Sequence, residues 1–532
     1  MENITSTPRE SLSQDLENLY IAIEKYIAGE YAYKELKHYS AQFGIYQQRD
    51  KNFMVRLRVT GNRLKAEHLN FVRTQLLDQF SIDYCRLTTR QDIQLHGVKA
   101  CDIKNIIELC NKSFFPFNGG GGDTFRNILV SEYSGLTKRS VFDVQPFVEK
   151  LWEKIGAWEC AFHMPRKFKM GVFDGPHDLG LAKIQDLGLV AKVKNDEHGF
   201  EVYVGGGLGA KTAEGIRLFE FLPAEKVVRL IHAMLELFND HGNRERRSLA
   251  RLRYVKERLG DDDFRTLCLQ YFQKSIVADN IKMVDSFGNY EPHQKACIES
   301  SIKTIGGDQD DFLRWKNLAT HKTIYTPQLK AVKLFIKEGN LTSNQLEMLE
   351  NIAKRYSFNN GEVAISYSQD IILPLVDANS LGELYDEIKQ VCDIVDFDLT
   401  SFSGHIRCCV GANVCSIGIL DSTTMSQKIA EALDDKYQDL LISNNVDDSQ
   451  KVLRVCDTVL ISGCPNCCAR HVTAKIGLSG KKMRIDDEVV DAYKIVSKHD
   501  NLAVIAAQEL GEFTVETAVK QVVDLIGKIV KK

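Results

Sequence analysis

Cysteine residues gather in two short motifs near the C-terminal end, and no other feature constrains the fold as strongly. The first motif, CVGANVC, places Cys409 and Cys415 in a C-x5-C arrangement. The second, GCPNCC, places Cys464 and Cys468 in a C-x3-C arrangement. Two close pairs of thiolates are typical of a polynuclear iron–sulfur site. The fold must therefore bring two segments about 50 residues apart to one place.

Two other interpretations of these cysteines remain open at this point. Free cysteine is among the most buried residue types, so the motifs are also compatible with an ordinary core. Seven of the 14 cysteines lie between Cys408 and Cys468, however, and this concentration weakens that interpretation. Four thiolates also bind zinc, but paired zinc ligands usually follow a C-x2-4-C pattern, from which the first motif departs.

Composition limits the class of protein. The chain has 532 residues, with 44% hydrophobic and 26% charged residues, which predicts several globular domains. A formal net charge of −4 argues against general nucleic-acid binding. The N-terminus has no apolar signal region, and no run of about 18 apolar residues predicts a membrane span. Many cysteines without a secretion signal indicate metal or redox chemistry in a reducing cytoplasm.

A small module occurs twice in the chain, at an offset of 278 residues. Gly61-Asn62 recurs as Gly339-Asn340, and Gln91-Asp92-Ile93 recurs as Gln369-Asp370-Ile371. In the first copy, alternation predicts strands over Phe53–Val59 and Cys85–Val98, with a helix over Leu64–Phe80 between them. The repeat therefore predicts two α+β modules. Three further identities share the same offset: Phe80 with Phe358, Leu95 with Leu373, and Val98 with Val376.

The two copies differ in their positive charges. Four arginines of the first copy are replaced by uncharged residues at the equivalent positions of the second copy. A purely structural module would not need this difference in charge. The difference predicts one site for an anionic ligand, built mainly by the first half of the chain. The pairs are Arg56 with Leu334, Arg58 with Ile336, Arg86 with Ala364, and Arg90 with Ser368.

Other segments show weaker patterns. Glycines 119–122 predict a flexible loop, with Asp123 as a cap. Lys167 and Lys169 point to one face of a predicted strand, where they repel each other unless an anion or solvent lies between them. The GGGLG run at 205–209 misses the GxGxxG pattern, so we predict no nicotinamide binding.

The remaining chain predicts mainly helices. Residues 1 to about 40 form a polar helical extension, residues 223–258 a long amphipathic helix with five arginines between residues 243 and 254, and residues 515–530 a final helix. Polar residues around Ser443–Gln450 predict a surface loop.

The two cysteine motifs, together with RLTTRQ (86–91) and PRKFK (165–169), resemble the siroheme- and [4Fe-4S]-dependent sulfite and nitrite reductases, and sulfite reductases of the ferredoxin-type or hemoprotein kind most closely. The resemblance covers about residues 40–480. It implies an α+β fold that is internally duplicated and three-lobed, with ferredoxin-like small modules and mixed-sheet catalytic lobes. The implied divisions are an N-terminal helical extension (1–40), ferredoxin-like half-modules (41–115 and 321–390), a first catalytic lobe with the cations (116–320) and a second with the cluster ligands (391–532).

The same resemblance implies the roles of individual residues. Cys409, Cys415, Cys464 and Cys468 would hold the [4Fe-4S] cluster, and the Cys468 thiolate would also bind the siroheme iron. Cys408 and Cys467 would not be ligands. The substrate anion would meet Arg56, Arg126, Lys167 and Lys169. Siroheme carries several carboxylates, which arginine binds in bidentate fashion; its implied contacts are Arg58, Arg86, Thr88, Arg90, Gln94, His96, Asn127, Arg251, Arg253 and Asn466.

The implied activity is six-electron reduction of sulfite to sulfide. Nitrite reductases of the family tend to carry Asn where this chain has Lys169, and a fourth cation favours the larger, more highly charged sulfite, but nitrite reduction to ammonia remains the alternative. A non-catalytic iron–sulfur electron carrier is the alternative from another class. Because the chain shows no flavin motif, the electrons would come from a separate ferredoxin or flavoprotein subunit.

Overall fold

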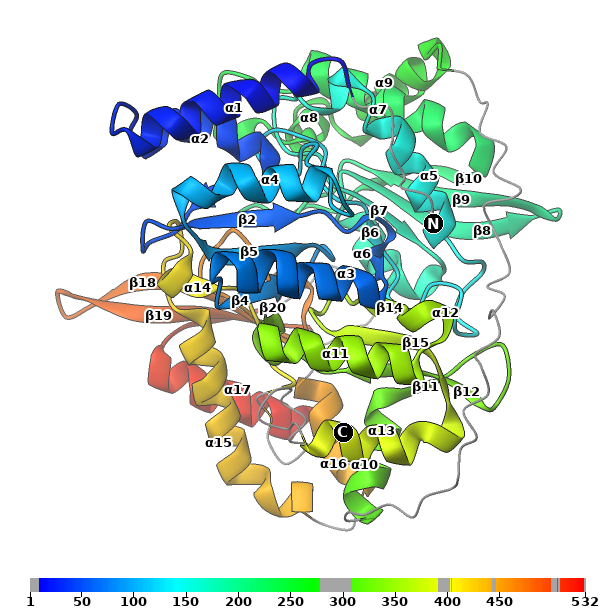
Figure 1. Ribbon diagram of the computed structural model, residues 1–532, viewed down its shortest axis with the longest axis vertical. Helices are drawn as coiled ribbons and strands as arrows, with labels where there is room; N and C mark the ends of the chain where they lie inside the picture. Colours follow the sequence, from blue (N-terminus) through cyan, green and yellow to red (C-terminus); the bar gives the residue numbers. More distant parts are fainter. Residues whose placement is uncertain are drawn as a thin grey trace.

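Three hydrophobic cores organise the molecule, whose computed structural model describes residues 9–277, 309–390, 402, 404–442, 446–456, 458–498, 505 and 508–530. The first core joins the N-terminal helices to both small modules, the second lies within residues 125–268, and the third lies within residues 402–526. Figure 1 shows the small modules (blue and yellow-green) in contact with both large lobes (cyan to green, and yellow to red). The chain thus has the expected three-lobed α+β architecture.

The small modules exchange strands. Their two antiparallel sheets have the orders β1-β2-β5-β4-β13 and β11-β12-β15-β14-β3, so each copy contributes one short strand to the other's sheet. Equivalent strands keep the offset seen in the sequence, which confirms the repeat. The strands are β1 (Tyr46–Gln47), β2 (Phe53–Leu57), β3 (Arg63–Leu64), β4 (Tyr84–Leu87), β5 (Ile93–Val98), β11 (Thr320–Lys322), β12 (Leu329–Leu334), β13 (Asn340–Thr342), β14 (Val363–Ile365) and β15 (Ile371–Asp377).

Helices cover these sheets. Strand β2 alternates buried and half-buried residues, as predicted, and the Thr342–Gln345 capping box begins α11. The predicted helix over 64–80 forms as α3 and a π-helical turn. The helices are α3 (Ala66–Phe71), η3 (Val72–Asp78), α4 (Ile103–Asn111), α11 (Ser343–Tyr356), α12 (Phe358–Gly361) and α13 (Leu381–Gln390).

Two further segments join the first core. Helices α1 (Leu12–Ile27) and α2 (Tyr33–Ser40) bury Leu19, Ile23 and Leu36 in it, as expected for a packed N-terminal extension. Helix α10 (Gln309–Ala319) buries Trp315 in the same core. We therefore propose that α10 belongs with the second small module and not with the first large lobe.

The two large lobes repeat one topology. In each, three parallel strands continue into two antiparallel ones, in the orders β6-β7-β8-β9-β10 and β16-β17-β18-β19-β20. The first half of β8 is buried throughout, as parallel strands covered on both faces are. The strands are β6 (Leu129–Val130), β7 (Met170–Phe173), β8 (Leu187–Lys194), β9 (Glu197–Val204), β10 (Ile216–Pro223), β16 (Arg407–Cys408), β17 (Val459–Ser462), β18 (Ile476–Ile485), β19 (Glu488–Ser497) and β20 (Gln508–Thr514).

Helices pack on these sheets, and two predictions about them are wrong. The single helix over 223–258 is interrupted, because the backbone becomes extended at Gly242 (φ −70°, ψ 140°) and the next α-helix begins only at Leu252. Gly242 packs against Pro165, where a Cβ would lie 2.5 Å from a side-chain carbon. Of the loop predicted at 443–450, residues 446–450 begin a helix that buries Val452 and Cys456, and 443–445 lie outside the described residues. The helices are α5 (Gln145–Ile155), α6 (Leu179–Lys183), α7 (Val227–His241), α8 (Leu252–Leu259), α9 (Asp261–Lys274), α14 (Gly411–Val414), α15 (Ser422–Ile442), α16 (Val446–Cys456) and α17 (Val515–Val530).

Two equivalent glutamines lock the small modules together. The Gln91 side-chain amide donates to the Ile365 carbonyl at 3.0 Å, and the Gln369 amide donates to the Leu87 carbonyl at 2.9 Å. Both glutamines have a left-handed backbone, with φ of +60° and +69°. Each one satisfies a buried carbonyl of the other copy, so the strand exchange leaves neither acceptor unpaired.

We predict that Gln369→Asn weakens this lock. Asn tolerates the left-handed backbone but is too short to reach the Leu87 carbonyl, whose loss of a partner costs about 1–3 kcal/mol. The urea-denaturation midpoint of the variant should fall measurably. Gln75→Asn, on an exposed side chain, is the matched control and should leave the midpoint unchanged.

Candidate active site

A row of polar side chains crosses the first small sheet. Arg56 on β2 lies opposite Gln94 on β5, and Gln94 lies opposite Arg86 on β4. Side chains opposite one another in adjacent strands share a face, so these three residues present their polar groups together. His96 lies two residues beyond Gln94 and points to the same face. The structure therefore brings four of the predicted site residues into one row.

His96 is a neutral, buried imidazole. Burial, followed by the nearby Arg86 and Arg56, lowers the pKa of His96 to about 3. Its ring stacks on Tyr84 with centroids 5.3 Å apart, yet neither ring nitrogen has a hydrogen-bond partner among the described residues. Buried polar atoms normally have partners. These two nitrogens suit a polar ligand on this face of the sheet.

The glycine run at 119–122 is a packed segment, which corrects the prediction of a flexible loop. A Cβ at Gly121 would lie 2.1 Å from the Ala41 carbonyl oxygen, so only glycine allows the two backbones to approach so closely. Asp123 caps no helix; it pairs with Arg166 and Arg247. The Gly120 carbonyl accepts hydrogen bonds from Arg56 at 2.7 Å and from Arg126 at 3.4 Å. The run thus fixes two of the predicted substrate cations.

The two lysines lie beside Arg126. Phe168 pairs with Phe125 in an isolated parallel bridge and is buried, so Lys167 and Lys169 point away from Phe168 together. Burial, then Arg126 and Arg251, lower the pKa of Lys167 to about 7. Burial lowers the pKa of Lys169 well below its usual value, and repulsion from Lys167 and Arg90 lowers it further. These side chains therefore repel one another and favour an anion among them.

Three other residues that were predicted to contact siroheme form hydrogen bonds within the protein itself. Arg90 donates to the Asn127 carbonyl at 3.1 Å, to the Met170 carbonyl at 2.7 Å and to the Gln185 side chain at 3.0 Å. The Asn127 amide donates to the carbonyls of Val59 and Arg90. The Thr88 hydroxyl accepts from the backbone of Arg90. Arg90 and Asn127 therefore hold the first small module against the first large lobe, whereas Thr88 orders the turn that carries Arg90.

Arg58 faces the same lobe. Its guanidinium lies 3.7 Å from the centre of the Trp152 ring and donates to the Phe125 carbonyl at 3.1 Å. Burial lowers the pKa of Arg58 to about 9, despite the opposing charge of Asp92, so Arg58 remains positively charged at neutral pH. Its buried Nη1 has no hydrogen-bond acceptor among the described residues and can still bind a carboxylate.

Arg251 and Arg253 support the second glycine run. Arg251 pairs with the buried Asp186 at 2.8 Å, and Arg253 donates to the Leu208 carbonyl at 2.6 Å. A Cβ at Gly207 would lie 3.2 Å from Arg251 Nη2. Asp186 also accepts a hydrogen bond from the Lys169 backbone, so it joins Arg251 to the segment that carries Lys169. The roles of both arginines toward siroheme stay predictions.

The first small module contacts the backbone of both cysteine motifs. Arg86 donates to the Cys408 carbonyl at 3.2 Å and Thr89 to the Cys468 carbonyl at 3.1 Å. Arg49 donates to the Cys415 carbonyl at 3.2 Å. The sequence motifs of the first and last thirds of the chain thus meet directly.

The four cysteines are spaced too widely for a single zinc ion. Zn–S bonds of about 2.3 Å would place tetrahedral sulfurs about 3.8 Å apart. No three of Cys409, Cys415, Cys464 and Cys468, all among the described residues, lie within 4.8 Å of one another. The Cys409 thiol accepts from the Gly463 backbone at 3.2 Å, which ties the first motif to the second. A soft donor set of this width fits a polynuclear iron–sulfur cluster.

The Cys468 thiol connects the cysteines to the cations. Burial raises the pKa of the Cys468 thiol to about 12, and the nearby Cys409 adds to this effect. The positive charges of Lys167 and Lys169 act in the opposite direction. The residue nevertheless has exposed surface. The influence of both lysines places this thiol beside them. Asn466 hydrogen-bonds to the Cys464 thiol and is exposed beside it, whereas Cys408 and Cys467 are buried.

Two residues of this site had not been predicted. Tyr46 accepts from the Gly122 backbone at 2.7 Å, and although its burial would raise its pKa, Arg126 and Arg56 shift it downward overall. Arg166 lies near Arg126 and pairs with Asp123 at 3.0 Å. Arg166 is part of the PRKFK motif, so its sequence position was a usable signal. Tyr46 had no such signal.

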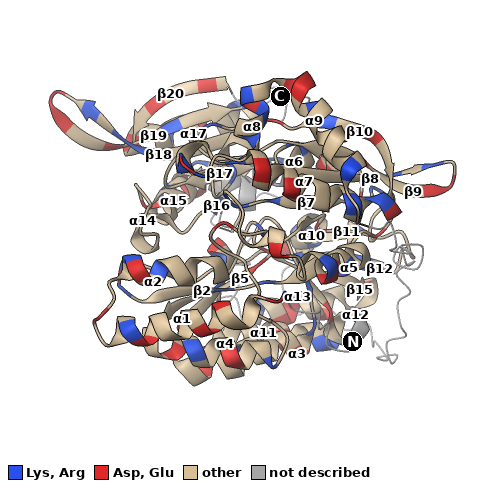
Figure 2. Ribbon diagram, turned by 90° about the horizontal axis from the view of Figure 1, so that it is seen from above, with Lys and Arg blue, Asp and Glu red and all other residues tan. Residues whose placement is uncertain are grey.

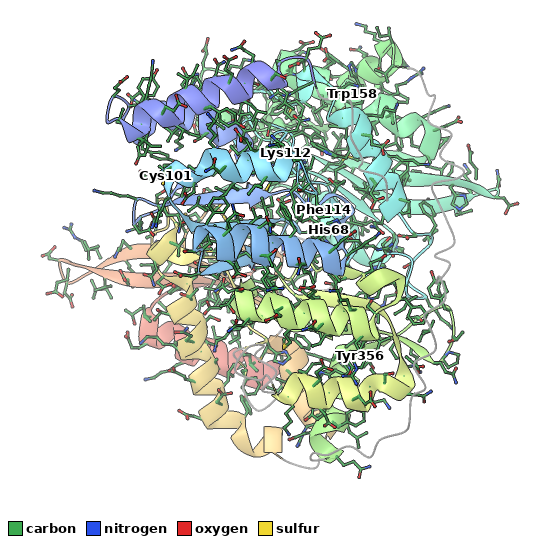
Figure 3. All side chains as sticks on the ribbon, in the orientation of Figure 1. His68, Cys101, Lys112, Phe114, Trp158 and Tyr356 are labelled. Atoms are coloured by element: carbon green, nitrogen blue, oxygen red, sulfur yellow. The ribbon has the colours of Figure 1, made fainter. Side chains whose placement is uncertain are left out.

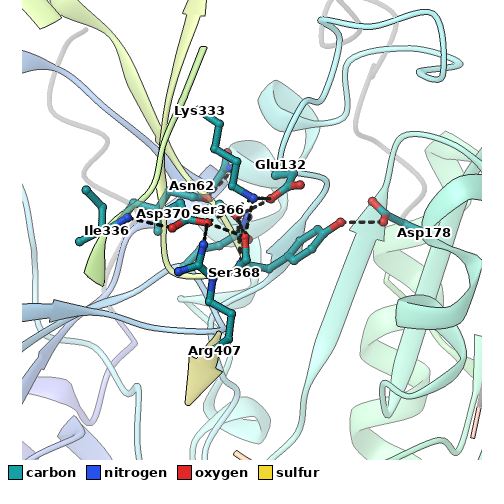
Figure 4. A network of polar contacts seen from close by, with 12 residues as sticks. Asn62, Glu132, Asp178, Lys333, Ile336, Ser366, Ser368, Asp370 and Arg407 are labelled. Carbon is teal, nitrogen blue, oxygen red and sulfur yellow. Dashed lines mark hydrogen bonds and ion pairs between the residues drawn. The ribbon is translucent and has the colours of Figure 1, made fainter. Parts of the chain in front are cut away.

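The second copy fills the equivalent place with its own charges (Figure 4). Fully buried Asp370 accepts from Arg407 at 3.0 Å, Lys333 at 3.2 Å and Ser368 at 2.9 Å. Ser368 and Ile336 stand where the first copy has Arg90 and Arg58. Asp370 and Glu132, which lies 3.9 Å from Lys333, together offset the charges of Lys333 and Arg407, so the network does not require an anionic ligand. The asymmetry predicted from the sequence is present in the structure.

Comparisons with known proteins agree with this site. The model of the "nitrite and sulphite reductase 4Fe-4S domain" matches residues 121–276, and that of the "nitrite/sulfite reductase ferredoxin-like half domain" matches residues 46–113 and 326–391. The chain belongs to the nitrite and sulfite reductase family, and its cofactors are siroheme and a [4Fe-4S] cluster.

Individual relatives carry both substrate names. The chain is 28% identical over 464 residues to a ferredoxin–nitrite reductase of Synechococcus elongatus, covering 83% of this chain and 79% of that one. It is 24% identical over 497 residues to a sulfite reductase [NADPH] hemoprotein beta-component of Leptospira biflexa, covering 82% and 80%. The solved structure of the Mycobacterium tuberculosis NirA protein has the same fold, with a TM-score of 0.76, 19% identity, and coverage of 98% and 94%.

The residues present suit both cofactors. The four thiols are soft ligands for iron, and the unpartnered polar atoms of His96 and Arg58 lie with Arg86 on the side of the small sheet that faces the cysteine motifs. Within the described part of the chain, no helix is long and apolar enough to span a membrane.

We predict that Lys167 gives the stability a pH dependence. The folded-state pKa of Lys167 is about 7 and its ordinary value is 10.5, so between these pH values the unfolded chain holds a proton that the folded chain lacks. The wild type should therefore gain stability relative to Lys167→Met as pH rises from 7 to 9, by at most about 1.4 kcal/mol per pH unit. Denaturation midpoints at several pH values measure this.

Lys112→Met is the control, because it removes one charge from the exposed end of α4 (Figure 3). A wild type and a Lys167→Met variant that respond identically to pH would contradict the burial of this ammonium group.

Proposed function

We propose that this chain reduces sulfite to sulfide in a six-electron reaction, with electrons from a separate donor protein. The observation that carries the proposal is the convergence of Arg126, Lys167 and Lys169 beside the Cys468 thiol. An electron carrier without a substrate has no need to bury mutually repelling cations beside its cluster. This weighs against the non-catalytic alternative.

The arginines and the lysines of the site have different chemical roles. Arg56 and Arg126 are held by the glycine carbonyls and offer hydrogen bonds to the oxygens of an anion. Lys167, with a pKa of about 7, exchanges a proton readily at neutral pH and suits the protonation of an oxygen that leaves as water. Lys169 adds a further charge to the same place. When bound, siroheme and the cluster supply the electrons and an iron that binds the substrate.

Nitrite reduction is the second candidate, because relatives named for either substrate match at similar identity. Charge favours sulfite: it is larger and more highly charged than nitrite, so it gains more from a fourth cation. Siroheme enzymes commonly reduce both anions, so the proposal concerns preference.

Lys169→Asn tests the preference directly. We expect kcat/KM for sulfite to fall roughly tenfold or more, since one charge-assisted hydrogen bond in a buried site contributes about 1.5–3 kcal/mol, while kcat/KM for nitrite falls less. Both constants are measured on one preparation with a reduced dye as the donor. Lys192→Asn, on an exposed strand end, controls for loss of charge. An unchanged ratio of the two constants would reject the assignment of sulfite to Lys169.

Cys468→Ser tests the proposed bridging ligand. We expect the variant to lose the iron–sulfur absorbance, the siroheme absorbance or both, because Ser is a poor ligand for this soft site. Cys101→Ser, at an exposed thiol, should retain both. A Cys468→Ser protein with normal iron content and both absorption bands would show that another residue bridges the cofactors.

The donor is proposed to be a ferredoxin or a flavoprotein subunit, and the compartment the cytoplasm. Two relatives are named for ferredoxin and for NADPH, respectively. We propose no nucleic-acid or membrane partner: Figure 2 shows acidic and basic residues interspersed on the helices in view, without one broad basic face.

A further inference from the structure

We propose that Cys160, His232 and Glu236 form a binding site for a divalent transition metal ion, for which Zn²⁺ is the best match. The site lies in the first large lobe and shares no residue with the cluster or the substrate cations. It would hold a structural metal in addition to the iron of the cofactors.

The backbone presents the three side chains to one another. His232 and Glu236 are four residues apart on α7, so they occupy one face on successive turns. Cys160 lies in the short helix η5 (Glu159–Ala161), whose carbonyl at Cys160 accepts from Asn239 of α7 at 2.9 Å. The sulfur, one imidazole nitrogen and one carboxylate oxygen all lie within 4.8 Å of one another. Ligands bound to one zinc ion lie about 3–4 Å apart, so a small adjustment of rotamers suffices.

The imidazole is poised as a ligand. His232 Nδ1 is buried and has no hydrogen-bond partner among the described residues. The Trp158 ring packs edge-on against the imidazole, with centroids 5.1 Å apart, and limits its rotation (Trp158 is labelled in Figure 3). A buried imidazole nitrogen without a partner is uncommon, and a metal ion would satisfy it.

The thiol and the carboxylate already face each other. Burial, then Glu236, raise the pKa of Cys160 to about 12, and the thiol donates a hydrogen bond to Glu236. Metal binding would replace this shared proton: the proton leaves to solvent, one sulfur–metal and one oxygen–metal bond form, and nothing is oxidised or reduced. One thiolate, one imidazole and one carboxylate suit zinc, with the fourth position left for water.

A second cluster of similar composition differs in a way that sharpens the choice. Asp174, His177 and Asp178 also lie within 4.8 Å of one another. There the carboxylates accept from Ser131, Ser140 and Tyr367, and His177 pairs with Asp174 at 3.3 Å. Of these carboxylate oxygens, Asp174 Oδ1 is buried without a hydrogen bond, but it lies 3.3 Å from His177 Nε2 and can pair with that imidazole without an ion. His177 therefore provides an internal control.

The position suggests what the metal would do. It would join η5 to α7 beside the Ala161 carbonyl, which accepts from the Phe125 backbone at 2.8 Å. Phe125 precedes Arg126, and the chain after η5 continues through Lys167 and Lys169 into β7. A metal here would stabilise the segments that position the substrate cations without touching the substrate.

The test measures zinc on the cofactor-loaded protein. After equilibration with buffered Zn²⁺ and removal of excess metal, we expect about one zinc per chain at full iron content. X-ray absorption at the zinc edge should show one sulfur at about 2.3 Å and nitrogen or oxygen at about 2.0–2.1 Å. The affinity of Cys160→Ser and of His232→Ala should fall by more than the roughly 10–100-fold seen when only an outer partner of a metal site is lost.

Matched variants separate the alternatives. Cys101→Ser and His177→Ala should bind zinc like the wild type. Normal siroheme and cluster absorbance in each variant shows that it has folded, and normal iron content shows that zinc has not entered the cluster site. Failure of the wild type to retain zinc, equal retention by Cys160→Ser, or a zinc shell without sulfur would each overturn the proposal. None of these outcomes bears on sulfite reduction, which is measured separately.

Discussion

Repulsion between buried cations is the interaction on which the rest of this structure depends. Arg56, Arg126, Lys167 and Lys169 gather beside the cysteine motifs, and burial with mutual repulsion lowers the pKa of both lysines. Such a cluster persists only where rigid segments hold it in place and an anion can neutralise it. The packed glycines 119–122 accept hydrogen bonds from Arg56 and Arg126. Asp186 joins Arg251 to the segment that carries Lys169. The catalytic potential of the chain therefore rests on its ability to keep these charges together.

Duplication gives the chain two equivalent places for such a site, and the structure uses only one of them for an external anion. In the first copy the cations lack enough protein carboxylate, and buried atoms of His96 and Arg58 have no partner within the described chain. In the second copy Asp370 and Glu132 offset the charges of Lys333 and Arg407. The exchanged strands and the two glutamine locks keep both copies in one rigid body. One half can thus lose its ligand site without loss of the fold that positions the other.

Much of the fold was predictable because it follows local patterns. The offset of the repeat, the alternation in β2 and the final amphipathic helix all appear in the structure as expected. The errors arose where tertiary contact overrides local pattern. The long helix ends at Gly242, whose backbone is extended and packs closely against Pro165, and glycines 119–122 serve close packing where flexibility had been expected. Neither contact can be read from neighbouring residues.

The sequence by itself determined which reactive groups the chain contains: the cysteines of the two motifs, the arginines of the first copy, and the resemblance to siroheme reductases that these residues carry. These features depend on residue type and spacing, which are local. Only the tertiary structure decided which groups meet: Arg86 and Thr89 at the cysteine backbones, Tyr46 beside Arg126, and Cys160 beside α7. These contacts join residues that lie between 72 and 379 positions apart in the sequence. Their geometry depends on packing between lobes, which no single segment specifies.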